Sequence, residues 1–129
     1  DLQQEMTLAF VFIAHDLSVV RYIADKIMVM YLGRIAEYGQ SEQIFSRPRH
    51  PYTQALLAST PHLKAQNRKQ RVILSGELPS PLSPPSGCVF HTRCPFATAQ
   101  CAEQVPEIIE FDGRLTSCLR AAEIAAEQD

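Results

Sequence analysis

An unbroken apolar segment that ends in a histidine constrains the fold of this chain more than any other feature. The run from Leu8 to Ala14 has the length of a β-strand, and no polar residue interrupts it. Such a run is typical of a strand covered on both faces, as in the parallel sheets of α/β proteins. His15 follows at the carboxyl end of this strand, where ligands bind in open α/β sheets. His15 is therefore either a functional residue or a buried histidine with a purely structural hydrogen bond.

The residues after His15 predict a helix, a hairpin and two further helices. Asp16 is suited to cap a helix that continues to about Ala24, because apolar residues recur there at helical spacing. Gly33 gives a turn signal between two strands, which predicts a hairpin. Glu37 lies between two apolar residues of the second strand, and we expect it on the solvent face. The predicted strands are residues 26–31 and 34–38, and the helices that follow are residues 41–45 and one that begins at Pro51.

Four short segments carry a family resemblance that covers the chain from residue 1 to about Leu119. They read Phe-Ile-Ala-His-Asp-Leu at 12–17, Ala-Asp-Lys-Ile-Met-Val-Met at 24–30, Gly-Arg-Ile-Ala-Glu-Tyr-Gly at 33–39 and Arg-Pro-Arg-His-Pro-Tyr-Thr-Gln-Ala-Leu at 47–56. Together they resemble the C-terminal part of the ATPase domain of an ABC transporter, and the last resembles the His-Pro-Tyr element of the oligopeptide/dipeptide importer subfamily. The resemblance implies that His15 is the catalytic switch residue, which contacts the γ-phosphate of ATP and helps to place the attacking water.

The phosphate-binding parts of such an ATPase are missing from this sequence. It contains no G-x-x-x-x-G-K-[ST] loop, no serine-glycine-rich signature segment and no apolar strand that ends in an Asp-Glu pair. We therefore expect a fragment, the last third of a larger subunit of the P-loop NTPase type. The full-length subunit would bind ATP and Mg²⁺, whereas the fragment alone would neither hydrolyse ATP nor bind it with useful affinity.

The organisation predicted from the sequence has three parts. Residues 1–60 form the C-terminal portion of the ATPase domain, residues 61–87 a polar and proline-rich linker, and residues 88–129 a loop-rich, cysteine-containing extension. Four prolines between residues 79 and 85 make the end of the linker extended and stiff, because proline fixes φ and removes a donor. The fold class is therefore α/β, followed by a tail with few regular elements.

The composition argues against some classes of binding partner and against a membrane-spanning chain. The formal net charge is −2, so no broad basic field argues for nucleic acid. The longest apolar run is far shorter than the roughly 20 residues that a bilayer-spanning helix needs. We expect an intracellular chain without a membrane span of its own.

The second chemical signal is a group of four cysteines with the spacing C-x5-C-x6-C-x16-C: Cys88, Cys94, Cys101 and Cys118. Disulfides are disfavoured in an intracellular chain. Zinc sites usually contain C-x2–4-C knuckles, which this spacing lacks. A 4Fe–4S cluster also takes four thiolates, and it needs loops that wrap around a larger body. On the residues alone, disulfides, zinc, an iron–sulfur cluster and bare thiols all stay open.

The segment Gly87-Cys88-x-Phe90-x-x-Arg93-Cys94, with the later Cys101 and Cys118, resembles the tail of the oligopeptide/dipeptide subfamily. In some members of that subfamily the four cysteines hold a 4Fe–4S cluster. The resemblance thus implies one metal centre with these four ligands, most simply a structural 4Fe–4S cluster and less readily zinc.

Two functions from different classes follow. The first is the C-terminal fragment of the ATP-hydrolysing subunit of an ABC importer for dipeptides, oligopeptides or a related solute such as nickel or a glutathione-like molecule. The resemblance implies a paired ATPase subunit, membrane-spanning permease subunits and an extracytoplasmic solute-binding protein as partners, with the subunit peripheral at the cytoplasmic face of the membrane. The second is an independent cysteine-rich metal-binding module. The sequence does not determine the solute or which of two paired subunits this is.

Overall fold

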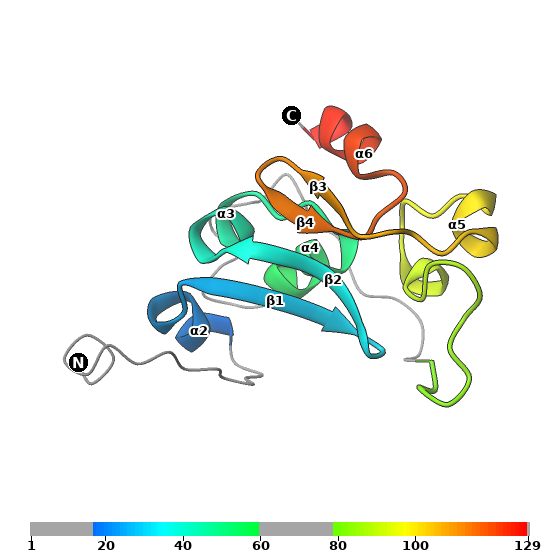
Figure 1. Ribbon diagram of the computed structural model, residues 1–129, viewed down its shortest axis with the longest axis horizontal. Coiled ribbons are helices and arrows are strands. Elements are labelled where there is room, and N and C mark those ends of the chain that lie inside the picture. The colour runs from blue at the N-terminus through cyan, green and yellow to red at the C-terminus, as the bar shows by residue number, and fades with distance from the viewer. Residues whose placement is uncertain (1–16, 60–78, 129) are drawn as a thin grey trace.

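The computed structural model describes residues 17–59 and 79–128 (Figure 1). The predicted apolar strand 8–14 and His15 lie outside the described residues, as does most of the predicted linker. Those two predictions therefore stay predictions.

The described chain mixes short helices with one sheet, as the α/β expectation requires at this coarse level. Helix α2 and the two strands after it agree with the predicted ranges to within about two residues, as is usual at element ends. The same holds for the two helices that follow. The elements are α2 (Leu17–Ile23), β1 (Lys26–Tyr31), β2 (Arg34–Gln40), α3 (Ser41–Ser46), α4 (Pro51–Ser59), the 3-10 helix η2 (His91–Arg93), α5 (Ala99–Glu103), β3 (Ile109–Phe111), β4 (Arg114–Thr116) and α6 (Ala121–Gln128).

The four strands form one antiparallel sheet in the order β1-β2-β4-β3. Leu32 and Gly33 connect β1 to β2 with φ values of 49° and 77°, and Asp112 and Gly113 connect β3 to β4 with 53° and 77°. Two successive residues with positive φ match the right-handed twist of the strands, which is why such turns close hairpins. Because β4 pairs with β2, the segment that carries the cysteines contributes two strands to the sheet begun by the first hairpin.

A β-bulge in the first hairpin corrects the predicted position of Glu37. Val29 pairs with Glu37 and Met30 pairs with Ile35, so Ala36 is an extra residue in β2. An extra residue interrupts the alternation of side chains across the strand. Ala36 and Glu37 are both buried as a result, and Glu37 is 0% exposed rather than on the solvent face.

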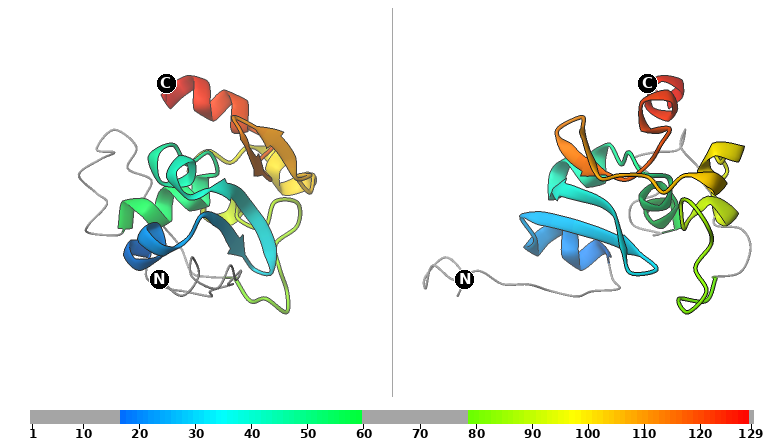
Figure 2. Two further views of the ribbon diagram at one scale, coloured as in Figure 1. Left: turned by 60° about the vertical axis from the view of Figure 1, so that its left-hand side comes forward. Right: turned by 45° about the vertical axis from the view of Figure 1, so that its right-hand side comes forward.

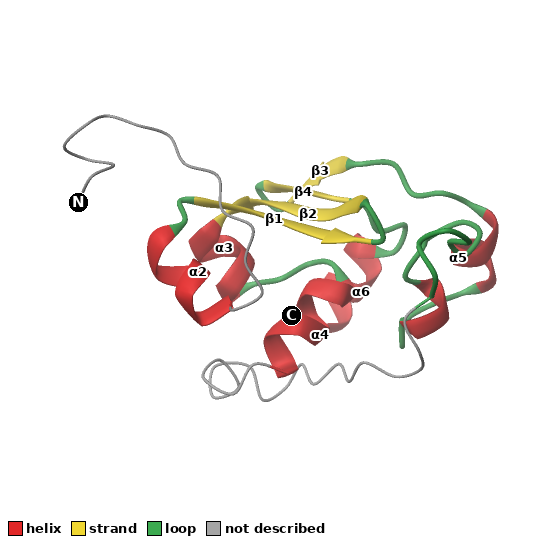
Figure 3. Cartoon of the chain, turned by 90° about the horizontal axis from the view of Figure 1, so that it is seen from below, coloured by secondary structure: helices red, strands yellow, loops and turns green. Residues whose placement is uncertain are grey.

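The main core lies between the sheet and the helices below it. Figure 3 shows α2, α3, α4 and α6 on one side of the sheet. On that side, a buried apolar cluster is made of Ile27, Val29, Ala36, Ile44, Phe45 and Leu57. On the opposite face Met28 and Met30 are about half exposed. In the described part of the chain, no helix is both long enough and apolar enough to cross a bilayer.

A smaller cluster connects the end of the first hairpin to the cysteine-containing loops. Tyr31, Val89 and Phe90 are its buried members. The rings of Tyr31 and Phe90 meet edge to face with centroids 5.1 Å apart, and Tyr52 of α4 packs against both. Figure 2 shows the loops around α5 beside the end of the sheet where β1 turns into β2. The aromatic cluster therefore attaches the cysteine-containing loops to the rest of the molecule.

Candidate functional site

The four cysteines predicted to act together line one cavity. Cys88 follows the turn at Gly87, Cys94 follows η2, Cys101 lies in α5 and Cys118 follows β4. All four are free thiols, with Cys101 buried and the others partly buried. The residues that complete the cavity wall include His50, Phe90, His91, Phe96, Arg120 and Ile124. The fold thus brings together side chains that are up to 30 residues apart in sequence.

The backbone around Cys88 and Cys101 is packed closely. The Cys88 N–H donates to the Cys101 carbonyl at 2.7 Å. Gly87 has φ +64°, and a Cβ there would lie 2.3 Å from the same carbonyl oxygen. Glycine is therefore required beside Cys88 both for its backbone conformation and for the space that a side chain would take.

The cavity disfavours the charged thiolate form of the cysteines when no metal is bound. Burial, together with repulsion between neighbouring sulfurs, raises the pKa of Cys94 to about 11 and the pKa of Cys118 to about 12. Burial also raises the pKa of Cys88, while backbone hydrogen bonds from Phe90 and His91 oppose that rise. Bound to a metal or a cluster, the same sulfurs would be deprotonated, so occupancy would release protons.

The four thiols are the donors that a metal centre could use here. Within residues 17–59 and 79–128, no three His, Cys, Asp or Glu side chains come close enough together to hold one metal ion. The four thiols nevertheless face one cavity. Four cysteine thiolates are the donor set that a 4Fe–4S cluster takes, one for each iron.

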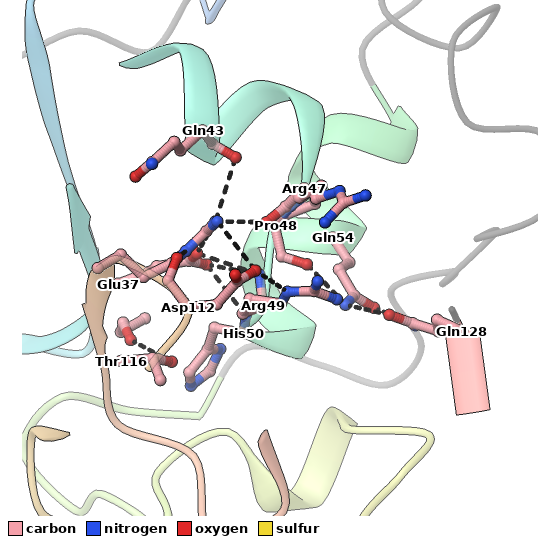
Figure 4. Close-up of polar contacts among 12 residues, drawn as sticks. Glu37, Gln43, Arg47, Pro48, Arg49, His50, Gln54, Asp112, Thr116 and Gln128 are labelled. Atoms are coloured by element: carbon pink, nitrogen blue, oxygen red, sulfur yellow. Dashed lines mark hydrogen bonds and ion pairs between the residues drawn. The ribbon is translucent and has the colours of Figure 1, made fainter. Parts of the chain in front are cut away.

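A buried polar cluster is centred on Glu37 (Figure 4). Its carboxylate accepts the backbone N–H of Arg49 at 3.0 and 3.2 Å and that of His50 at 3.0 Å. Arg114 of β4 donates to it through Nη1 at 3.0 Å. A buried charge is tolerated only when it is paired and hydrogen-bonded, and Glu37 meets both conditions.

Asp112 and the loop before α4 extend the same cluster. Asp112 Oδ2 lies 2.8 Å from Nε of Arg49 and 3.5 Å from Nη2 of Arg114. Arg114 Nη1 also donates to the backbone carbonyls of Gln43 and Arg47. Two arginines and two carboxylates therefore join the β3–β4 hairpin to β2 and to the loop between α3 and α4.

His50 occupies the amino end of α4, next to the cysteine cavity. Its Nδ1 accepts the N–H of Tyr52 at 3.0 Å and so caps the helix, while Pro51 takes the first helical position. Burial lowers the pKa of His50 to about 4, and a hydrogen bond to the Ser117 backbone partly opposes this shift. These contacts give His50 a structural role as the cap of α4.

The sequence analysis placed Glu37 on the solvent face and assigned no role to Arg114 or Arg120. Arg114 is 77 residues from its partner Glu37, so no local pattern connects them. Arg120 lies two residues after Cys118, and that proximity is the one signal that could have drawn notice.

The comparisons with known proteins identify the family of this chain. The family described as oligopeptide/dipeptide transporter, C-terminal region, matches residues 36–101. This stretch runs from β2 to Cys101 and includes the His-Pro-Tyr element. The chain therefore belongs to this family, and the predicted resemblance is confirmed.

Individual relatives match over nearly the whole chain. The dipeptide transport ATP-binding protein DppF of Escherichia coli (strain K12) is 54% identical over 129 residues, covering 100% of this chain and 37% of that protein. Its counterpart in Haemophilus influenzae is 56% identical over 119 residues, covering 92% of this chain and 36% of the relative. The di/tripeptide transport ATP-binding protein DppF of Pseudomonas aeruginosa is 50% identical over 121 residues, covering 94% and 38%. The chain thus spans little more than a third of these relatives.

Proposed function

We propose that this chain is the C-terminal part of the ATP-hydrolysing subunit of an ABC importer for dipeptides, oligopeptides or a related small solute. The observation that carries the proposal is the similarity along the whole chain to relatives named for dipeptide and di/tripeptide transport. In the complete subunit, ATP and Mg²⁺ would be bound mainly by residues that this chain lacks. His15 would act as the switch residue beside the γ-phosphate, where positioning and electrostatics supply most of the catalysis of phosphoryl transfer.

The proposed partners follow from the same assignment. They are a paired ATPase subunit, membrane-spanning permease subunits and an extracytoplasmic solute-binding protein, with the ATPase subunit peripheral at the cytoplasmic face. The full-length subunit, assembled with its membrane partners in vesicles, should hydrolyse ATP faster when the binding protein carries a dipeptide. Parallel assays with a longer peptide, glutathione and nickel would identify the solute class. A rate that responds to none of these solutes would contradict the importer assignment.

We further propose that Cys88, Cys94, Cys101 and Cys118 bind one 4Fe–4S cluster. The observation that supports this proposal is that the four thiols line one cavity. When bound, the cluster would neutralise the thiolates and stabilise the loops between the short elements of residues 88–118. Metal ligation contributes much of the folding energy of such small loop-rich segments.

Anaerobic purification tests this cofactor directly. The protein should be brown, absorb broadly in the visible range and contain roughly four irons per chain. Replacement of any one cysteine with serine should bleach it and make residues 88–118 sensitive to protease. Colourless protein with one zinc would favour a structural zinc site instead. Colourless protein with four titratable thiols would exclude both.

An independent cysteine-rich metal-binding module is the second hypothesis, and no observation here favours it. The upstream reading frame discriminates between the two. A phosphate-binding loop and a signature segment in that frame would support the importer subunit, and their absence would support the module.

A further inference from the structure

Arg120 lies against the cysteine cavity and connects two of the segments that supply its thiols. Its Nη1 donates to the Phe96 carbonyl at 2.6 Å, in the loop between Cys94 and α5. Its own backbone belongs to the turn that follows Cys118. The Cys94 loop and the Cys118 turn are thus joined by one side chain, although they are more than 20 residues apart in sequence.

Helix α6 holds the Arg120 side chain in place. Nε of Arg120 lies 3.0 Å from Oε2 of Glu123, and Nη2 lies 4.0 Å from Oε1 of Glu127. The arginine is about one-fifth exposed, whereas both glutamates are mostly exposed to solvent. Of these three charged side chains, Arg120 is the one that lines the cavity.

Arg120 is the one permanently charged side chain among the described residues that line the cavity. Its guanidinium lies near Cys94, and its backbone N–H is hydrogen-bonded to the Cys118 thiol. No other described residue of the cavity wall combines these contacts with a bond between two ligand loops.

We infer that Arg120 is a positioning residue of the cysteine centre, which joins the Cys94 loop to the Cys118 turn and places a positive charge beside the ligands. This inference rests on the proposed 4Fe–4S cofactor. A cluster held by four thiolates becomes more negative by one charge on reduction. A fixed positive charge beside it therefore stabilises the reduced form and raises the midpoint potential.

The test uses the full-length subunit, purified anaerobically, in three variants. Arg120→Gln removes the charge, Arg120→Lys keeps it, and Arg93→Gln is the matched control. Arg93 precedes Cys94 directly, but its guanidinium donates to the Tyr31 hydroxyl at 3.4 Å. The readouts are iron content per chain, the half-time of bleaching in air, and the midpoint potential from a redox titration followed in the visible range.

Arg120→Gln should shift the midpoint potential to a more negative value and shorten the bleaching half-time several-fold. Arg120→Lys should return the potential close to the wild-type value, and Arg93→Gln should change it much less than Arg120→Gln. Loss of iron from Arg120→Gln that Arg120→Lys restores would also support the inference.

Two results would overturn the inference while leaving the cofactor proposal intact. One is an Arg120→Gln variant that keeps the wild-type potential and bleaching rate. The other is an equal shift in Arg93→Gln, because nearby charge alone would then explain the effect. Wild-type protein that is colourless and free of iron would overturn the cofactor proposal, and the inference with it.

Discussion

Glu37 and Arg114 form an ion pair 3.0 Å long in which both side chains are almost completely enclosed, at 0% and 2% exposure. The pair joins β2 of the first hairpin to β4 of the C-terminal hairpin. These strands pair through only two residue pairs, Glu37 with Thr116 and Tyr38 with Leu115. Side chains therefore contribute a large share of the contact between the two hairpins.

Replacing Glu37 with Gln should lower the free energy of unfolding by about 3 kcal/mol, because it leaves a buried arginine without its carboxylate. Denaturant unfolding followed by circular dichroism measures this change. Glu110→Gln, on an exposed position of β3, is the matched control and should change stability by less than about 0.5 kcal/mol. Equal effects of the two substitutions would contradict the role assigned to Glu37.

His50 should make the chain less stable as the pH falls from about 6.5 to about 4. Its folded pKa of about 4 is below the ordinary value of 6.5, so in this window the unfolded state binds more protons. The stability due to neutral His50 is complete above pH 6.5 and is lost as the pH falls toward 4, by roughly 3 kcal/mol in total. Asp112 adds little above pH 4.5, because its hydrogen bond from Arg49 lowers the pKa of its carboxyl.

The measurement is urea unfolding at a series of pH values. His50→Asn keeps an acceptor at the amino end of α4 but removes the titrating group. Its stability should depend much less on pH between 6.5 and 4.5 than that of the wild type. If the free energy of unfolding of His50→Asn depends on pH as steeply as that of the wild type, other groups cause the pH dependence.

Gly87→Ala should abolish assembly of the proposed metal centre. The new Cβ would lie 2.3 Å from the Cys101 carbonyl oxygen and 2.7 Å from the Ala102 carbonyl carbon, so the Cys88 loop would have to move. Iron content and visible absorbance of anaerobic protein report the loss. Gly33→Ala is the control, since Gly33 also has positive φ at +77° but meets no atom within 4 Å. It should cost only about 1–2 kcal/mol of backbone strain and retain iron. A Gly87→Ala protein with full iron content would contradict the close packing described here.

His15→Ala in the full-length subunit should nearly abolish steady-state ATP hydrolysis while Mg-ATP still binds. The predicted histidine contributes one contact to the γ-phosphate, and that contact matters most when charge develops during transfer. Phosphate release measures turnover, and a fluorescent nucleotide measures binding. His62→Ala, a substitution in the predicted linker, should leave both unchanged. Ordinary turnover in His15→Ala would remove its assignment as the switch residue.

Local patterns in the sequence were sufficient for the secondary structure of the first hairpin and of the helices after it. Gly33 closes the β1–β2 turn because glycine takes positive φ readily, and Pro51 begins α4 because proline fixes φ near the helical value. Family membership was also evident from the sequence, since the His-Pro-Tyr element is a contiguous signal. The switch role of His15 and the identity of the metal are still predictions.

The tertiary structure alone decided which polar residues are buried and which partners they have. Glu37 was expected in solvent because it alternates with apolar neighbours, but the bulge at Ala36 turns it inward, where Arg114 compensates its charge. Arg120 acquires its position only when the Cys94 loop and the Cys118 turn meet. Propensity and periodicity act over a few residues along the chain, whereas charge pairing and cavity formation depend on distances in space. The sequence by itself therefore determined the elements up to α4 and the family, whereas the packing of distant segments determined the C-terminal strands and helices, the polar cluster and the surroundings of the four cysteines.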